Sequence, residues 1–375
     1  MKRTIICSAL VFLLGCSEEK SSEQLLKFEI SAKYSVNLSH VGLSSMRAFH
    51  IALVETEPNL FLIFNPFSRT IDSLLIDGEH TKVTQGIEIP FEGPNGVESF
   101  NYFIPFRNHF IFLDHNSVYL PDSGDLRRVD FSRFPLLRNE NLEDITRGNS
   151  LADGFDFLDY KNSKIYLIFE SFTNNQKQLV SYDISKNEVE LINLDLIKEM
   201  EKHIITYNDA GIKVENPYHP FLKVEDNFLI ISYPFSNKFH LYHLLEKEQI
   251  NLEPKSKLFK NEKSLPDKNW DNSSFINYME ISNAWQDDIK FGSFFKLGSS
   301  LYYRIINGGK EDENSNNFIE VFDLDFNKLG ETDLSKIHSD LGDNFLPIGS
   351  KIFVKAKTQS DEDILDFYLI SIDKN

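Results

Sequence analysis

Short runs in which apolar and polar residues alternate recur along the chain, separated by polar turns. In residues 164–194 such a run, centred on Ile165, Leu167 and Phe169, is followed by a polar loop, a second run, a tight turn and a third run. Alternation with a period of two is the pattern of a pleated strand, whose successive side chains point to opposite faces. This segment therefore predicts three consecutive strands.

The same unit is predicted six times. Its central strand recurs at residues 60–64, 109–113, 165–169, 228–232, 301–305 and 352–356. Inner strands are predicted before these copies at residues 50–54, 101–106, 155–159, 221–224, 293–297 and 345–348. A third strand follows most copies, and an outer strand follows it in five. Spacings of about fifty to seventy residues are typical of propeller blades with loop insertions. The predicted fold class is all-β, a six-bladed β-propeller.

The two ends of the chain support a closed ring. The sixth unit has no outer strand, because the chain ends at Asn375 directly after its third strand, whereas the alternating residues 26–38 precede the first unit and belong to none. An N-terminal strand would complete the sixth blade and leave no open edge. This coincidence favours one propeller domain, residues 26–375, over a two-domain sandwich.

Loop lengths predict two unequal faces. In antiparallel four-stranded blades, the first and third turns emerge on one face, and the second turns and blade crossings on the other. The first class is short throughout, whereas all the long insertions fall in the second: residues 131–153, 195–219, 253–291 and 307–317. Residues 196–205 have the spacing of a short helix that Asp195 would cap. Binding sites usually occupy loops on a rigid scaffold, so the long-loop face is the expected functional surface.

Composition and charge exclude some partners. The 375 residues are 41% hydrophobic, enough for a large core, and the formal net charge is −18. Nucleic acids and anionic lipid surfaces require a basic patch, so neither is an expected partner. The acidic balance favours a neutral or cationic partner.

The N-terminus carries an export signal. Lys2 and Arg3 precede an apolar run, residues 4–14, that is too short to span a bilayer. The sequence Leu-Leu-Gly-Cys ending at Cys16 resembles the lipobox of bacterial lipoproteins. Residues 1–15 would then be a signal peptide, Cys16 the lipid anchor and residues 16–25 a polar tether. The alternative is an ordinary secretory signal in which Cys16 occurs by chance. Cys7 would be removed with the signal, so the mature chain would keep Cys16 alone and could form no internal disulfide.

A family resemblance extends from Cys16 to the C-terminus. Residues 17–20, Ser-Glu-Glu-Lys, resemble the surface-export tag of Bacteroidota lipoproteins. Together with the lipobox, the six repeated strands and the segment Glu-Gly-Pro-Asn-Gly at 92–96, they make the chain similar to uncharacterised Bacteroidota lipoproteins with six-bladed, TolB-like propellers. The resemblance implies an outer-membrane location in the cell envelope, with cell-surface exposure as the finer expectation, and implies no activity.

Candidate chemistry is sparse. The common nucleophile, zinc, phosphate-loop and dinucleotide motifs are absent from the sequence. One set of residues has a spacing close to that of a calcium loop, which binds the ion through oxygen ligands. The alternative is a solvated hairpin tip. The main expectation is that the protein has no cofactor. The residues with this spacing are Asp312, Asn314, Asn316, Glu320 and Asp323.

Two function classes remain open. Polar residues at or near the starts of inner strands would line the channel and could serve a metal-assisted, lactonase-like hydrolase or lyase; they are His50, Asn101, Asp156, His219 and Asn344. Aromatic residues in the 253–291 insertion would, if exposed, anchor a partner on the long-loop face, or else fix the loop to the blade; they are Trp270, Tyr278 and Trp285. The favoured hypothesis is a non-enzymatic binding module for an envelope protein, a peptide or a glycan.

Overall fold

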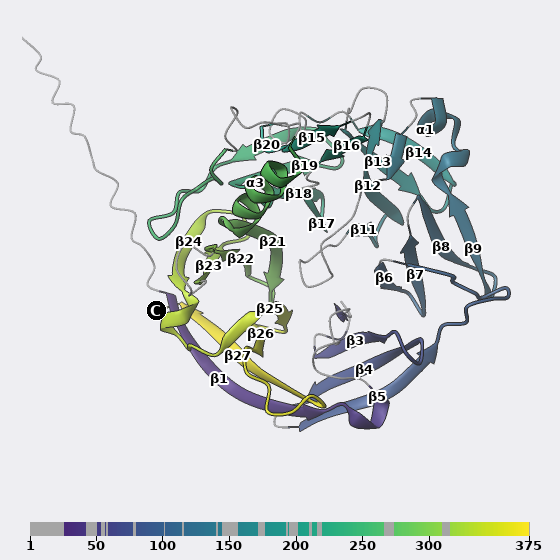
Figure 1. Cartoon of the computed structure of the whole chain (residues 1–375). Coiled ribbons are helices and arrows are strands. Elements are labelled where there is room, and N and C mark those ends of the chain that lie inside the picture. The colour runs from purple at the N-terminus through teal and green to yellow at the C-terminus, as the bar shows by residue number, and fades with distance from the viewer. Residues whose placement is uncertain are drawn as a thin grey trace, which may run out of the picture.

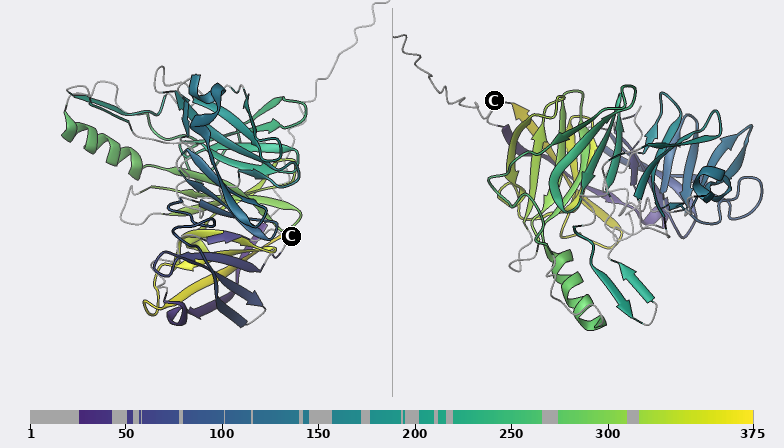
Figure 2. Two further views of the ribbon diagram at one scale, coloured as in Figure 1. Left: turned by 90° about the vertical axis from the view of Figure 1, so that its right-hand side faces the viewer. Right: turned by 90° about the horizontal axis from the view of Figure 1, so that it is seen from above.

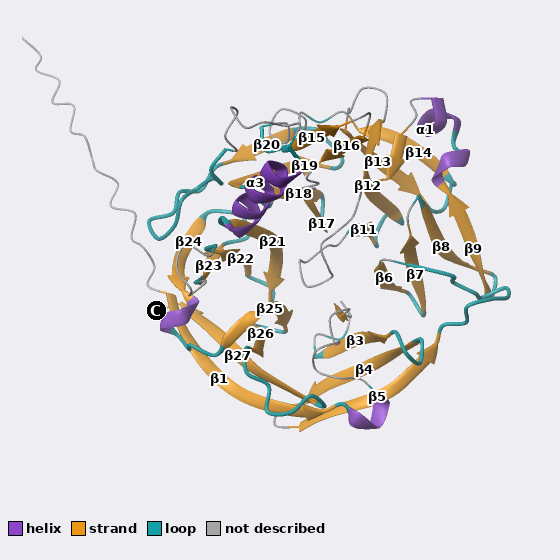
Figure 3. Ribbon diagram, viewed as in Figure 1, coloured by secondary structure: helices purple, strands orange, loops and turns teal. Residues whose placement is uncertain are grey.

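Six antiparallel β-sheets stand in a ring around a central axis (Figure 1). Each sheet is one blade, and Figure 3 shows that strands dominate and helices are few. The fold is therefore a six-bladed β-propeller, as the repeated strands predicted. The computed structural model describes residues 26–42, 51–53, 57, 59–77, 80–100, 102–114, 116–139, 142–144, 157–171, 177–192, 194, 202–209, 212–215, 220–265, 274–309 and 316–374.

The strands follow one another from the inside of each blade to its outside. Blades one to three consist of β2 (Ile51–Leu53), β3 (Leu60–Asn65), β4 (Thr70–Asp77) and β5 (His80–Glu88); β6 (Tyr102–Phe106), β7 (His109–Asp114), β8 (Ser117–Asp122) and β9 (Asp125–Asp130); and β10 (Leu142–Asp144), β11 (Leu158–Asp159), β12 (Lys164–Ser171), β13 (Lys177–Asp183) and β14 (Glu188–Ile192). Blades four to six consist of β17 (Phe221–Glu225), β18 (Phe228–Tyr233), β19 (Ser236–His243) and β20 (Gln249–Leu252); β21 (Lys290–Leu297), β22 (Leu301–Asn307), β23 (Asn317–Phe322) and β24 (Lys328–Asp333); and β25 (Leu341–Ile348), β26 (Lys351–Ala356), β27 (Ile364–Lys374) and β1 (Leu26–Asn37).

The first strand of the chain closes the ring. β1 pairs antiparallel with β27 from Leu26 opposite Lys374 to Asn37 opposite Ile364. The rings of Tyr34 and Phe367 stack across this pair with their centroids 5.2 Å apart. The purple β1 therefore lies beside the yellow β27 in Figure 1, and the predicted closure by residues 26–38 is confirmed.

Blade three departs from the predicted pattern at its inner edge. An inner strand was predicted at residues 155–159; Leu158–Asp159 form β11 and pair there with β12, Phe157 is not in the strand, and residues 155–156 lie outside the described residues. The far half of β12 pairs instead with β10, which belongs to the insertion before it. Two short strands thus share the edge of one long strand, since the backbone groups along that edge require partners.

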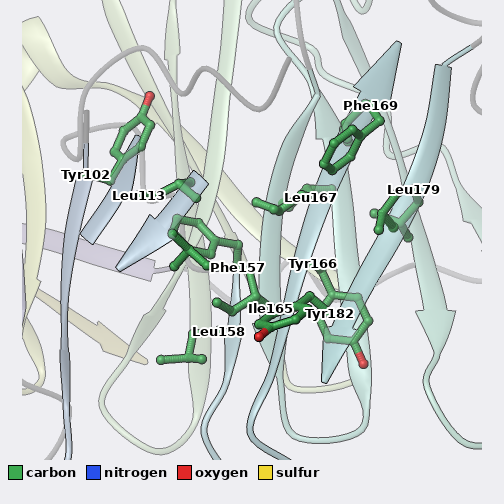
Figure 4. Close-up of a cluster of buried hydrophobic side chains, with 14 of the residues drawn as sticks. Tyr102, Leu113, Phe157, Leu158, Ile165, Tyr166, Leu167, Phe169, Leu179 and Tyr182 are labelled. Atoms are coloured by element: carbon green, nitrogen blue, oxygen red, sulfur yellow. The ribbon is translucent and has the colours of Figure 1, made fainter. Parts of the chain in front are cut away.

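Both faces of each blade are packed, because each blade lies between two others. In β12, Ile165, Leu167 and Phe169 point to one side and Tyr166 to the other, and all are buried. Figure 4 shows them packed with side chains of β11, β13 and blade two. Burial on both sides explains the nearly continuous apolar runs in the sequence.

The two faces of the ring differ, as the loop lengths predicted. One face, here called the short-turn face, carries the first and third turns, for example residues 107–108 and 123–124. The other, the insertion face, carries the second turns and the blade crossings. Its additions are η2 (Phe131–Arg133), α1 (Pro135–Asn139), the hairpin of β15 (Thr206–Asp209) and β16 (Ile212–Glu215), residues 253–265 and α3 (Phe275–Asp287). Figure 2 shows α3 and this hairpin projecting from the same side of the ring.

Shorter elements complete the described chain. They are the 3-10 helices η1 (Ser39–Val41) and η4 (Leu334–Lys336). No helix among the described residues is long and apolar enough to cross a membrane. Of the helix predicted at 196–205, residues 196–201 lie outside the described residues, and residues 202–205 are not helical.

Candidate functional site

The most elaborate part of the insertion face is α3, which the sequence reasoning expected to be loop. The side chain of Ser274 caps the helix by accepting a hydrogen bond from the backbone N–H of Asn277, at 3.4 Å. Tyr278, Ser282 and Trp285 are its buried residues. Their spacing of four and three places them on one stripe, which faces the blades. This helical spacing, behind a serine cap, was the signal in the sequence that could have revealed the helix.

The base of α3 contacts two other segments of the chain. The His203 ring, 2% exposed, stacks on Phe235 at 4.1 Å between centroids and lies 6.1 Å from the Trp285 ring. His203 Nε2 lies 3.2 Å from Glu262 Oε1. Burial lowers the pKa of His203, against the opposing effect of Glu262, because the imidazolium form would lose its hydration. The crossing from blade three, the second turn of blade four and α3 therefore meet at one buried point.

Lys263 is the most unusual group at this point. It is 2% exposed, and its Nζ donates to the backbone oxygens of Trp285, at 2.5 Å, and Asp288, at 3.3 Å. The same Nζ lies 4.4 Å from the centroid of the Trp285 ring. Burial lowers the pKa of Lys263 to about 8, and the Asp288 charge opposes this shift. The ammonium group thus joins the 253–265 loop to the C-terminal end of α3.

The free end of α3 packs on the neighbouring hairpin. Tyr207, in β15, lies 5.4 Å from Phe275 and 5.8 Å from Tyr278 between ring centroids. The Tyr207 hydroxyl donates to Asp209 Oδ2 at 3.0 Å. These contacts make one projecting unit of α3 and the hairpin.

The structure corrects the expectation of exposed aromatic anchors. Tyr278 is 6% and Trp285 4% exposed, so neither is an exposed anchor; Tyr278 packs on Tyr207 of the hairpin, and Trp285 packs at the base of α3 beside His203. Of the two hypotheses, partner anchoring or attachment of the insertion, the burial of both residues supports attachment. Trp270 lies outside the described residues. The exposed apolar side chains of the insertion are others, which sequence reasoning missed.

Exposed apolar side chains are more numerous on the insertion face than on the short-turn face. The first turns of α3 expose Phe275, Ile276 and Met279, with Ile276 70% exposed. Phe67, in the second turn of blade one, and Phe91, in the next crossing, are exposed on the same face. In the turns of the short-turn face, Leu245 and Leu324 are exposed, and Leu75 and Ile250 are exposed at the strand ends beside it. Scattered apolar residues are normal on any surface, whereas neighbouring ones such as Phe275, Ile276 and Met279, on the first turns of one helix, are typical of a contact surface.

Four of the five predicted channel residues are not among those that the structure describes. His50, Asn101, Asp156 and His219 lie outside the described residues. Asn344 is half-buried in β25, the inner strand of blade six. No group of three or more His, Cys, Asp or Glu side chains in the described part of the chain is arranged to hold a metal ion. The channel hypothesis therefore stays a prediction.

The predicted calcium loop is wrong for two of its residues. Glu320 lies fully buried in the middle of β23, paired with Arg304 and Lys328. Asp323 caps the following turn, where its carboxylate accepts from the backbone N–H groups of Asp325 and Asn327. A strand holds these ligands apart, whereas a calcium loop must fold them around one ion. Asn316 directly precedes β23, and Asp312 and Asn314 lie outside the described residues.

Comparison with known proteins shows the family. A model described as a domain of unknown function, DUF4221, matches residues 30–333. The chain belongs to the DUF4221 family. The matched residues run from within β1 to the end of β24, so blades one to five lie inside the match. No curated protein matches this chain.

Two solved structures from Bacteroides species are similar. A member of the DUF4221 family from Bacteroides vulgatus ATCC 8482 has a TM-score of 0.64 and 14% identity, with 94% of this chain and 100% of that chain covered. A putative exported protein from Bacteroides fragilis NCTC 9343 has a TM-score of 0.49 and 12% identity, with 94% and 97% covered. At these identities, the first likeness shows the fold alone.

Proposed function

We propose that this DUF4221 chain is a Bacteroidota lipoprotein with a TolB-like propeller, anchored in the outer membrane through Cys16, that acts as a binding module. The observation that carries the binding proposal is the group of neighbouring exposed apolar side chains on the first turns of α3, Phe275, Ile276 and Met279. The lipobox and the export signal in residues 1–16 support the anchor. Exposure at the cell surface belongs to the same proposal, on the basis of residues 17–20.

The chemistry of the insertion face favours a protein or peptide as the partner. Phe275, Ile276 and Met279 are all exposed, and together they offer an aromatic ring, an aliphatic side chain and a flexible thioether, a mixture that suits the varied apolar side chains of a protein or peptide. The net charge of −18 favours a neutral or cationic partner. The rigid attachment of α3 through Tyr278 and Trp285 lowers the entropy cost of binding.

The test compares two equally exposed residues on opposite faces. Ile276, on α3, and Leu245, in the turn after β19, are both 70% exposed. The double substitution Ile276→Ala with Met279→Ala should weaken crosslinking of the protein to its partner in envelope extract, and Leu245→Ala should not. Loss of the crosslinked product in the Leu245 variant, or its full retention in the double variant, would contradict binding through α3.

The anchor has a separate test. Cys16→Ala should abolish incorporation of labelled lipid and release the protein from the membrane fraction. Lipid label on the variant would show that Cys16 is not the attachment site. Binding through the insertion face can be measured on the released protein, so each part of the proposal can be tested without the other.

A further inference from the structure

The tether reaches the propeller on the short-turn face. Leu26, the first described residue, pairs with Lys374 at the end of β27, and Asn37 pairs with Ile364 at its start. β27 starts from the second turn of blade six, on the insertion face, and runs towards the short-turn face. Leu26 therefore lies at the short-turn end of the outermost strand of blade six.

This attachment point is fixed by packing. The Leu26 side chain lies against β24 of blade five, where a Cβ atom added at Gly330 would come within 3.1 Å of Leu26 Cδ1. The pairing with β27 continues along eleven residue pairs with one register shift, between Ile30 and Ala32. A strand held by β27 of its own blade and by β24 of blade five does not peel away to lengthen the tether.

The length of the tether limits which face can approach the membrane. Ten peptide units join Cys16 to Leu26, and they span at most about 35 Å when fully extended. β1 has 12 residues and is about 40 Å long, so a tether that brought the insertion face onto the lipid would have to run past its whole length. The 13 residues of α3 add about 20 Å of projection beyond that face.

We infer that the short-turn face lies towards the membrane and the insertion face points away from it. This inference rests on the proposed lipid anchor at Cys16. Its consequence concerns the partner: the exposed turn of α3 with Phe275, Ile276 and Met279 binds a macromolecule located away from the bilayer, and does not insert into lipid. The turns of the short-turn face have no projecting element among the described residues, so this face can approach a flat surface closely (Figure 2).

Energy transfer from the protein to the membrane surface tests the orientation. Once Cys16 is lipidated, the mature chain has no other cysteine, so Leu324→Cys and Ile276→Cys each provide one labelling site. Leu324 lies in the third turn of blade five, on the short-turn face, and is 48% exposed. Leu324 belongs to blade five, and Ile276 belongs to the crossing that leads from blade four into blade five. The two labels therefore differ mainly in their height above the membrane.

The lipidated variants are reconstituted in vesicles of phosphatidylethanolamine and phosphatidylglycerol that contain an acceptor-labelled lipid. Transfer should be at least about twofold more efficient from position 324 than from position 276, because the labels are separated by the length of a blade strand and by the projection of α3. Insertion of twenty Gly and Ser residues after Ser21 should reduce this difference. Equal transfer, or stronger transfer from position 276, would overturn the orientation.

Failure of the anchor is distinguishable from failure of the orientation. The mass of the N-terminal peptide reports whether Cys16 carries lipid. An unmodified Cys16 would overturn the proposed anchor and the orientation with it, whereas a lipidated Cys16 with stronger transfer from position 276 would overturn the orientation alone.

Discussion

Arg304 and Glu320 form a completely buried ion pair on adjacent strands of blade five. Arg304 Nη2 lies 2.7 Å from Glu320 Oε2, and its Nε donates to the same oxygen at 2.8 Å. The other oxygen of Glu320 accepts from Lys328 Nζ at 2.6 Å. The guanidinium also faces four phenylalanine rings at the contact of blades four and five: Phe239, Phe291, Phe294 and Phe322. Each charge is therefore compensated inside the core.

Glu320→Gln should lower the free energy of unfolding by about 3–5 kcal/mol, because it leaves the buried Arg304 charge without its counter-charge. Urea denaturation followed by fluorescence measures this loss. The double variant Arg304→Met with Glu320→Leu should recover much of it, since well-packed apolar residues replace a buried pair at little cost. As a control, Glu253→Gln breaks the exposed pair with Lys255 and should change stability by less than about 1 kcal/mol. Equal effects of both glutamine variants would contradict this account.

Two residues of α3 should give opposite results. Trp285→Ala should lower the free energy of unfolding by about 3–5 kcal/mol, because it removes a buried ring that contacts His203 and Lys263. Ile276→Ala should change it by less than about 0.5 kcal/mol, because the side chain is exposed. Thermal melts of the two variants provide the measurement. A stable Trp285 variant would mean that α3 is not held through this ring.

The unfolding free energy should rise with pH between about 8 and 10.5 through the contribution of Lys263. In this window the unfolded chain keeps the lysine proton, since its pKa there is 10.5, while the folded protein has released it at about 8. The unfolded state then binds more protons, so increasing pH favours the folded state. Urea midpoints from pH 7.5 to 9.5 should rise more steeply for the natural protein than for Lys263→Met. Parallel curves would show that Lys263 does not titrate in this range.

Removal of residues 26–38 from the mature protein should open the ring. The deletion exposes the edge of β27 and removes the partner that stacks on Phe367, and an open strand edge promotes association between chains. Size-exclusion chromatography should show oligomers or aggregates, and the melting temperature should fall. As a control, removal of residues 17–24 alone should leave both unchanged. A monomeric deletion variant with the original melting temperature would refute closure as a source of stability.

Sequence periodicity was sufficient to predict the scaffold. Each strand has a local pattern of alternating residues, and the number of repeated strands limits how they can be arranged. Alternation at residues 165–169 specifies a strand whatever surrounds it, and six repeats at similar spacing admit few arrangements other than a ring. The unmatched run at residues 26–38 and the missing sixth outer strand determined the closure. Even the unequal faces followed from loop length alone.

The surface of the insertion face depended on tertiary structure. Trp285 and Ile276 are both large apolar residues of one insertion, and composition gives no reason to bury one and expose the other. Burial is decided by which stripe of α3 meets His203 and Lys263, and these residues come from two other segments of the chain. Likewise, the spacing of Glu320 and Asp323 along the sequence matched that of a calcium loop. In the structure Glu320 lies within the extended strand β23, which holds the two carboxylates apart. The sequence by itself determined the ring and its closure through local periodicity, whereas long-range packing decided which side chains remain available for a partner.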